Sequence, residues 1–302
     1  MLLQITHSTT YRYSAPVEIQ PHQLRLEPRH DGAQDTLDFR LKISPTPAGI
    51  TEQIDLEGNL VRVVWFNGAH QEFNIEAETI VETRRANPFD FLRPPAELIL
   101  GRIYSEQESE SLTPYLVRES PQTTKSVDQL AAEVASQTHH DPLDFLIALN
   151  QEICNRIEFK HRDQGKPLAP WITLERGSGA CRDTAVLFID ACRSVGLAAR
   201  FASGYHLNTD TKQANELHGW VEVFLPNAGW RGIDPTVGIW VADEHVTVAA
   251  SAHSGHCAPV SGAYCGQATA SLDTEVTIRK IDEEMIASTI DLIREHFSHR
   301  RR

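Results

Sequence analysis

The hydrophobic pattern of this 302-residue chain changes its period once, and that change limits the folds open to it. From Leu2 to about Arg84, apolar and polar residues alternate in runs such as LLQITHSTTYRY, VEIQPHQLRLEP and EFNIEAETIVET, with Pro, Gly and Asn between them. A two-residue period divided by turn residues is typical of strands. About five or six such runs predict an all-β, sandwich-like domain over residues 1–85.

The rest of the chain has a different pattern. Residues 86–125 mix prolines with acidic and polar residues and show no steady period, which is typical of a linker. Helical runs follow, and one of them has Asp141 as N-cap and Pro142 at its first helical position. A largely apolar helix from Cys181 precedes the strand-like runs AARFASGYHL, LHGWVEVFLP and GWRGIDPT. Residues 126–302 are therefore predicted to form an α+β domain that ends with a strand and an amphipathic helix.

Charge and composition exclude several classes of function. The formal net charge is −13, and Lys and Arg do not cluster except in the last few residues, so neither a nucleic-acid surface nor an anionic membrane is an expected partner. No run reaches the roughly 18 to 20 apolar residues of a membrane span, and no signal peptide is evident. The five cysteines are scattered and odd in number. These features predict a cytoplasmic protein without a disulfide framework.

The stretch GSGACRDT raises the possibility of thiol chemistry. It places Cys181 at the start of a helix, where unpaired N–H groups and the helix dipole stabilise a thiolate. A base and a group that orients the base follow in order, His218 in LHGWVEVFLP and Asp234 in GWRGIDP. The short connection NAG at 227–229 makes the two strands candidate hairpin partners, which would bring the histidine beside the aspartate.

The stretches GACRDTAVLFIDACRSVGLAARFASGY and LHGWVEVFLPNAGWRGIDPT closely resemble the transglutaminase-like superfamily of papain-type cysteine enzymes. THSTTYRYSAPV and DLEGN resemble the all-β N-terminal region of its bacterial members. The resemblance implies a papain-like transglutaminase core, a buried helix packed on an antiparallel sheet, with Cys181, His218 and Asp234 as its triad. Members of the family commonly carry an acidic segment where this chain reads HSGHCAPVSGAYCG.

Two kinds of function remain open. The first is cysteine-dependent acyl transfer on a peptide, protein or carboxamide substrate, either hydrolysis by a protease or amidase or transfer to an amine by a transglutaminase. The alternative is a non-catalytic protein-binding module that retains the fold. Neither function requires a cofactor. The β-rich domain is expected to pack against the catalytic domain and to shape substrate access.

Other candidate residues receive structural interpretations. Asp183 is expected to complement the helix dipole, and Cys154 and Cys192 to be core or helix-packing thiols. Trp220 and Trp230 are more typical of strand packing than of a cleft wall.

A rival zinc site is conceivable in the loop near residue 255. It lacks a C-x-x-C pair, so no metal is predicted there. Its candidate ligands are His245, His253, His256, Cys257 and Cys265.

Overall fold

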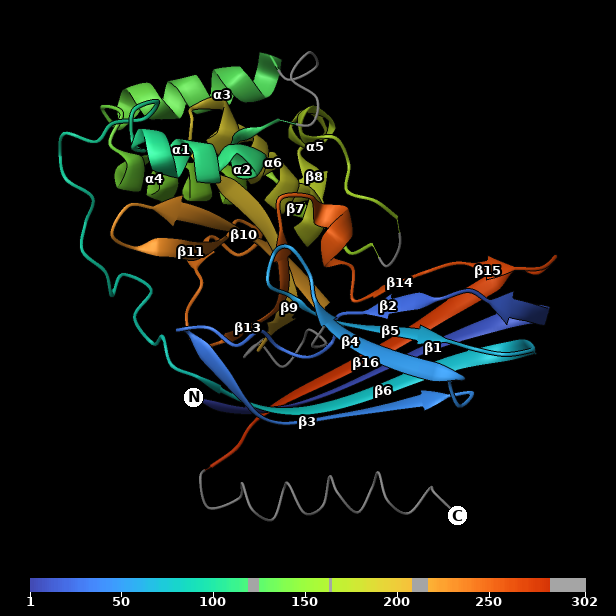
Figure 1. Ribbon diagram of the computed structural model, residues 1–302. Coiled ribbons are helices and arrows are strands. Elements are labelled where there is room, and N and C mark those ends of the chain that lie inside the picture. Colours follow the sequence, from blue (N-terminus) through green and yellow to red (C-terminus); the bar gives the residue numbers. More distant parts are fainter. Residues whose placement is uncertain (119–124, 163–164, 208–216, 283–302) are drawn as a thin grey trace.

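The computed structural model describes residues 1–118, 125–162, 165–207 and 217–282. Figure 1 shows an all-β part in the lower half of the view and, above it, a sheet covered by helices. This arrangement confirms the predicted fold class, an α+β core preceded by an all-β region.

Two antiparallel sheets form the all-β region. Their strands are β1 (Leu2–Ile19), β2 (His22–Leu24), β3 (Gln34–Ser44), β4 (Gly49–Ile54), β5 (Leu60–Trp65), β6 (Ala69–Thr83), β14 (Val260–Ser261), β15 (Tyr264–Cys265) and β16 (Ala270–Lys280). One sheet has the order β15-β1-β6-β3, with β16 also paired to β1, and the other has the order β14-β2-β5-β4. Val17, Val64 and Phe73 are buried in one cluster because alternate residues of each strand face the core.

Of the described strands in this region, β14, β15 and β16 come from the C-terminal part of the chain. β16 runs antiparallel to β1, with Leu3 opposite Lys280 and Tyr13 opposite Ala270. The sequence prediction assigned the closing strand to the 126–302 domain, whereas it completes the N-terminal sheet (Figure 1). Alternation identifies a strand and its buried face, but it does not identify which distant strand will be the partner.

The segment predicted as a linker carries structure of its own. It contains α1 (Glu106–Ser111) and α2 (Thr113–Leu116), and α1 begins with a capping box between Ser105 and Glu108. Leu100 and Ile103 from this segment are buried in the hydrophobic core of the helical region. Helices this short show too few turns for a period to be recognised in the sequence.

Where the structure describes the predicted catalytic region, it is built from a central sheet and four helices. The sheet has the order β12-β11-β10-β9-β13. Helix α6 lies against β9 and β10, and its Leu187 and Phe188 are fully buried in the core. The elements are α3 (Lys125–Gln137), α4 (Pro142–Arg156), β7 (Glu158–Phe159), α5 (Pro170–Arg176), β8 (Ser178–Gly179), α6 (Cys181–Ser194), β9 (Ala199–His206), β10 (Leu217–Leu225), β11 (Gly229–Asp234), β12 (Ile239–Trp240), β13 (His245–Ser251) and the 3₁₀ turn η2 (Ser254–Cys257).

The two regions share a packed interface. Leu3 and Ile5 of β1 lie in one apolar cluster with Tyr205 of β9 and Val246 of β13. Nearby, Asn59 is fully buried and both donates to and accepts from the backbone of Ala250, at 3.0 and 2.9 Å. The β-rich part therefore packs against the central sheet, as expected.

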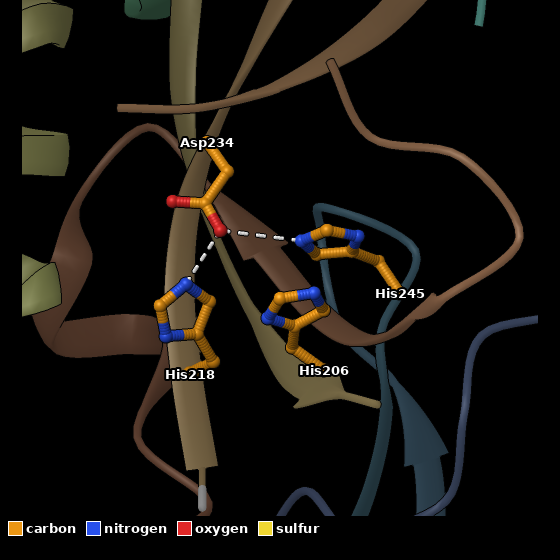
Figure 2. Close-up of side chains that lie close together, drawn as sticks. All are labelled: His206, His218, Asp234 and His245. Carbon is orange, nitrogen blue, oxygen red and sulfur yellow. Dashed lines mark hydrogen bonds and ion pairs between the residues drawn. The ribbon is translucent and has the colours of Figure 1, made fainter. Parts of the chain in front are cut away.

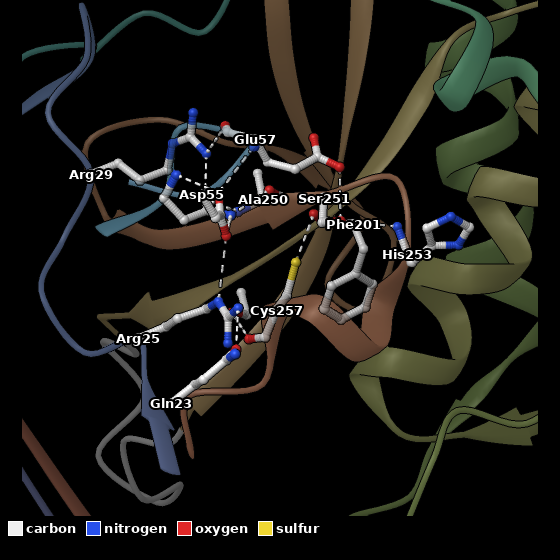
Figure 3. Close-up of polar contacts among 12 residues, drawn as sticks. Gln23, Arg25, Arg29, Asp55, Glu57, Phe201, Ala250, Ser251, His253 and Cys257 are labelled. Atoms are coloured by element: carbon white, nitrogen blue, oxygen red, sulfur yellow. Dashed lines mark hydrogen bonds and ion pairs between the residues drawn. The ribbon is translucent and has the colours of Figure 1, made fainter. Parts of the chain in front are cut away.

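A second set of interface contacts is polar. Glu57 accepts hydrogen bonds from the Ser251 hydroxyl and the Ala252 N–H, at 2.9 and 3.0 Å. Figure 3 shows Glu57 beside Ser251, with Asp55 close to Arg25 and Arg29. These bonds attach the hairpin between β4 and β5 to the end of β13.

The predicted C-terminal helix lies outside the described residues, beyond position 282. None of the described helices is both long enough and apolar enough to cross a lipid bilayer.

Gly204 on β9 provides a test of how closely the central strands pack. A methyl group added there would lie 1.9 Å from the Val246 carbonyl oxygen and 3.0 Å from the Trp220 ring. Gly204→Ala should therefore lower the free energy of unfolding by about 1–3 kcal/mol, the usual cost of overpacking. Gly255→Ala is the control, because its added methyl meets no atom within 4 Å. Equal urea midpoints for the two variants would contradict this packing.

Candidate active site

Cys181 is the first residue of α6, as the sequence predicts. The preceding helix α5 ends at Arg176 and is capped by Gly177, whose φ of 61° lies in the left-handed region that suits glycine. Two residues of β8 then pair in parallel with β7 and lead to Ala180, the N-cap of α6. The thiol therefore lies at the positive end of a buried helix, beside N–H groups that lack partners within the helix.

Asp183 fixes this turn. Its side chain is buried, and it accepts hydrogen bonds from the Ala180 N–H at 2.8 Å, the Leu168 N–H at 2.8 Å and the Arg162 guanidinium at 2.6 Å. The structural interpretation of Asp183 agrees with these contacts, but the carboxylate does more than complement the helix dipole. It joins the start of α6 to the segment before α5, which holds Cys181 in place.

His218 and Asp234 lie on neighbouring strands, as the hairpin prediction requires. β10 and β11 pair antiparallel, with Val221 opposite Ile233. The His218 Nε2 donates to Asp234 Oδ2 at 2.6 Å (Figure 2), and the Thr236 N–H donates to Oδ1 at 2.9 Å. Asp234 is fully buried, whereas the His218 side chain is 14% exposed.

The Cys181 thiol lies against His218. Burial by itself would raise the pKa of Cys181, but a hydrogen bond to His218, the positive charge of that ring and the Gly219 N–H together lower it. Burial would likewise lower the pKa of His218, yet the Asp234 carboxylate and the bonds to Asp234 and Cys181 raise it well above its ordinary value. The opposed shifts favour a thiolate beside an imidazolium.

A further link joins the two halves of the site. The Thr184 hydroxyl, in the first turn of α6, donates to the Cys181 carbonyl at 2.9 Å and contacts the Thr236 hydroxyl at 3.0 Å. Thr236 follows Asp234 by two residues, so the helix that carries the thiol is bonded to the turn that carries the carboxylate. The structure thus brings all three predicted site residues together.

Two histidines near the site were not assigned to it from the sequence. The His245 Nε2 donates to Asp234 Oδ2 at 3.2 Å, and its side chain is 1% exposed. His206 stacks on His245 with ring centroids 4.1 Å apart. The only signal in the sequence was a histidine near the end of one strand run and another that had been considered for a zinc site. Strand pairing, which places His245 directly opposite His206, brings them to Asp234.

The rival zinc loop does not assemble a site. Cys257 is buried and its thiol donates to the Phe201 carbonyl, while Cys265 is exposed on β15 opposite Glu18. His253 and His256 contact each other edge to face. Among the described residues, these side chains do not form a cluster of metal-ligating atoms.

The remaining cysteine and tryptophan candidates lie outside the group formed by Cys181, His218 and Asp234. Cys192 is buried in the core, and the Cys154 thiol is 3.9 Å from the Thr236 carbonyl. Trp220 is fully buried, which fits the strand-packing interpretation. Trp230 lies under the Arg200 guanidinium and lines a cavity of about 210 Å³ between the two regions, so it does wall a cavity.

A helix that begins with a cysteine and packs on an antiparallel sheet carrying histidine and aspartate defines a transglutaminase-like core. Two family models match the chain, the bacterial transglutaminase-like N-terminal region over residues 3–82 and the transglutaminase-like superfamily over residues 128–235. The chain belongs to the transglutaminase-like superfamily, as its motifs predict.

The similarity to known proteins covers nearly the whole chain. A crystal structure from Cytophaga hutchinsonii, named "Putative Cysteine Protease", has a TM-score of 0.71 at 19% identity and covers 93% of this chain and 92% of its own. Uncharacterized protein ML0607 of Mycobacterium leprae is 23% identical over 92% of this chain and 99% of its own length. Uncharacterized protein Rv2569c of Mycobacterium tuberculosis is 25% identical over 91% of each. At these identities the crystal structure supports the fold.

The lowered pKa of Cys181 predicts unusual reactivity in mild acid. Alkylation by iodoacetamide requires a thiolate, so a thiol with the ordinary pKa of about 8.5 slows about tenfold per pH unit below that value. The rate at Cys181, read by mass spectrometry of its peptide, should fall far less between pH 8 and pH 6. N-acetylcysteine is the reference thiol, and parallel rate losses for the two would contradict the thiolate–imidazolium pair.

Proposed function

We propose that the protein is a cysteine-dependent acyl-transfer enzyme that acts on carboxamide or peptide bonds. One observation carries the proposal. The Cys181 thiol, whose pKa is lowered by the neighbouring His218 ring, lies beside an imidazole that is hydrogen-bonded through Nε2 to a fully buried carboxylate, Asp234. A nucleophile, a base and a group that orients the base, in contact in that order, are what covalent acyl transfer requires.

In the first half-reaction, the Cys181 thiolate attacks the substrate carbonyl carbon and forms a carbon–sulfur bond. The tetrahedral oxyanion lies at the N-terminus of α6, where the Cys181 N–H and the helix dipole stabilise its charge. The carbon–nitrogen bond then breaks. The leaving amine or ammonia takes the proton of the His218 imidazolium, and a thioester remains on Cys181.

In the second half-reaction, a nucleophile attacks the thioester carbonyl and gives its proton to His218. The carbon–sulfur bond breaks, and the ion pair of Cys181 and His218 forms again. Water as the nucleophile makes the enzyme a protease or amidase, whereas an amine makes it a transglutaminase. Asp234 keeps His218 oriented and stabilises its positive charge throughout.

The alternative is a protein-binding module that uses the same fold without catalysis. Such a module does not need a thiol paired with a charged imidazole, and the opposed pKa shifts of Cys181 and His218 favour the enzyme. The two functions differ in a simple experiment, because a binding module retains its partner when Cys181 is replaced, whereas an enzyme loses turnover.

The three site residues should differ in their effect on turnover. Cys181→Ala should abolish it, and His218→Ala should nearly do so, because the thiol loses its base and the leaving group its acid. Asp234→Asn should leave a residual rate reduced by about 100- to 10,000-fold, the usual effect of losing the orienting group. The measurement is kcat/KM on glutamine-containing peptides, with and without an added primary amine, by ammonia release and mass spectrometry.

Two controls accompany this series. Cys265→Ala removes an exposed thiol on β15 and should leave turnover within about twofold of the unchanged protein. Thermal melts show whether each site variant is folded. Substantial turnover by folded Cys181→Ala protein would overturn the proposed function.

A further inference from the structure

His206 and His245 lie beside the proposed triad, but the acyl-transfer steps do not use them. They are directly opposite each other on β9 and β13, with their rings stacked at an interplanar angle of 13°. In Figure 2 both rings lie on the side of Asp234 that is away from the Asp234 backbone, with His218 next to them. No described residue forms a hydrogen bond with the His206 ring nitrogens.

The four side chains converge at one point. One ligand atom from each of His206, His218, Asp234 and His245 can be chosen so that all four lie within 4.8 Å of one another. Zinc binds nitrogen and carboxylate oxygen at about 2.0–2.2 Å in a tetrahedron, which places ligand atoms about 3.3–3.6 Å apart. To complete the coordination shell, the widest pair must close by about 1 Å, while His218 Nε2 and Asp234 Oδ2, now 2.6 Å apart, must separate by a little less. Side-chain rotation allows both movements.

The surroundings of these side chains favour binding of an ion. A ligand set of three imidazoles and one carboxylate binds zinc in preference to hard cations such as magnesium or calcium. The Thr236 N–H holds Asp234 Oδ1 at 2.9 Å, which leaves Oδ2 facing the imidazoles. His206 and His218 are partly exposed, whereas Asp234 and His245 are buried, so an ion can enter from the side of the two partly exposed rings.

We propose that His206, His218, Asp234 and His245 form a zinc site that competes with the hydrogen bond between His218 and Asp234. An ion bound there takes the His218 nitrogen and the Asp234 oxygen that otherwise bond to each other at 2.6 Å. His218 is then unable to exchange a proton with Cys181, and its orientation by Asp234 is lost. Zinc is thus an inhibitor of this protein, with no part in the acyl-transfer steps.

The inhibitory consequence rests on the proposed function, whereas zinc binding itself does not. Zinc also binds thiolates, so the binding experiment uses Cys181→Ala protein that has been stripped of metal with a chelator. Isothermal titration with zinc chloride should show one equivalent bound. Adding His206→Ala or His245→Ala to this background should weaken binding by at least about tenfold.

His256→Ala in the same background is the matched control. It removes an exposed histidine of the rival loop and should leave zinc affinity unchanged. Absence of binding, or equal binding by the His206→Ala, His245→Ala and His256→Ala proteins, would overturn the zinc site. Circular dichroism of each protein distinguishes a lost ligand from a lost fold.

A second measurement tests inhibition in protein that retains Cys181. Zinc should slow the alkylation of Cys181, and EDTA should restore the original rate. The fold-inhibition is the metal-free rate of each protein divided by its rate with zinc. This ratio should be smaller for His206→Ala than for the unchanged protein. Equal fold-inhibition with and without His206 would show that zinc acts on the thiol alone and would contradict the site. His206-dependent zinc binding in a protein without any turnover would instead support the site and overturn the proposed enzyme.

Discussion

The Asp234 carboxylate is charged and has no contact with solvent, and the arrangement of the site depends on how that charge is accommodated. Burial by itself would raise its pKa, but the charge of His218 and hydrogen bonds from His218 and His245 hold the pKa far below the ordinary value. A buried carboxylate is stable only with such donors. Asp234 thereby stabilises the imidazolium of His218, which in turn favours the thiolate of Cys181.

Strand pairing and helix capping supply this geometry from different parts of the chain. The hairpin of β10 and β11 places His218 beside Asp234, and β13, which also carries part of the interface with the all-β region, supplies His245. Asp183 and Thr184 fix the first turn of α6 against these strands. After the central sheet, the chain returns to the all-β region, where β16 pairs with β1. The two regions are therefore connected by the chain as well as by packing.

Local sequence signals predicted the features that depend on residues close together in the chain, such as turns, helix starts and hairpins. A glycine turn before an apolar helix indicated Cys181, and the short NAG connection indicated that His218 and Asp234 face each other. The pairing of β16 with β1 and the positions of His206 and His245 result from contacts between distant strands, which periodicity does not encode. The buried Leu100 and Ile103 of the predicted linker were missed because they lie outside any helix or strand, where no period marks a buried face.

The central claim is that Asp234 activates Cys181 through His218, and selective covalent labelling tests it directly. A peptidyl epoxide is offered to the unchanged protein and to the His218→Ala and Asp234→Asn variants, and the modified peptide is identified by mass spectrometry. The account predicts fast labelling at Cys181 in the unchanged protein, slower labelling in Asp234→Asn and almost none in His218→Ala. Equal labelling rates at Cys181 in all three folded proteins would contradict it.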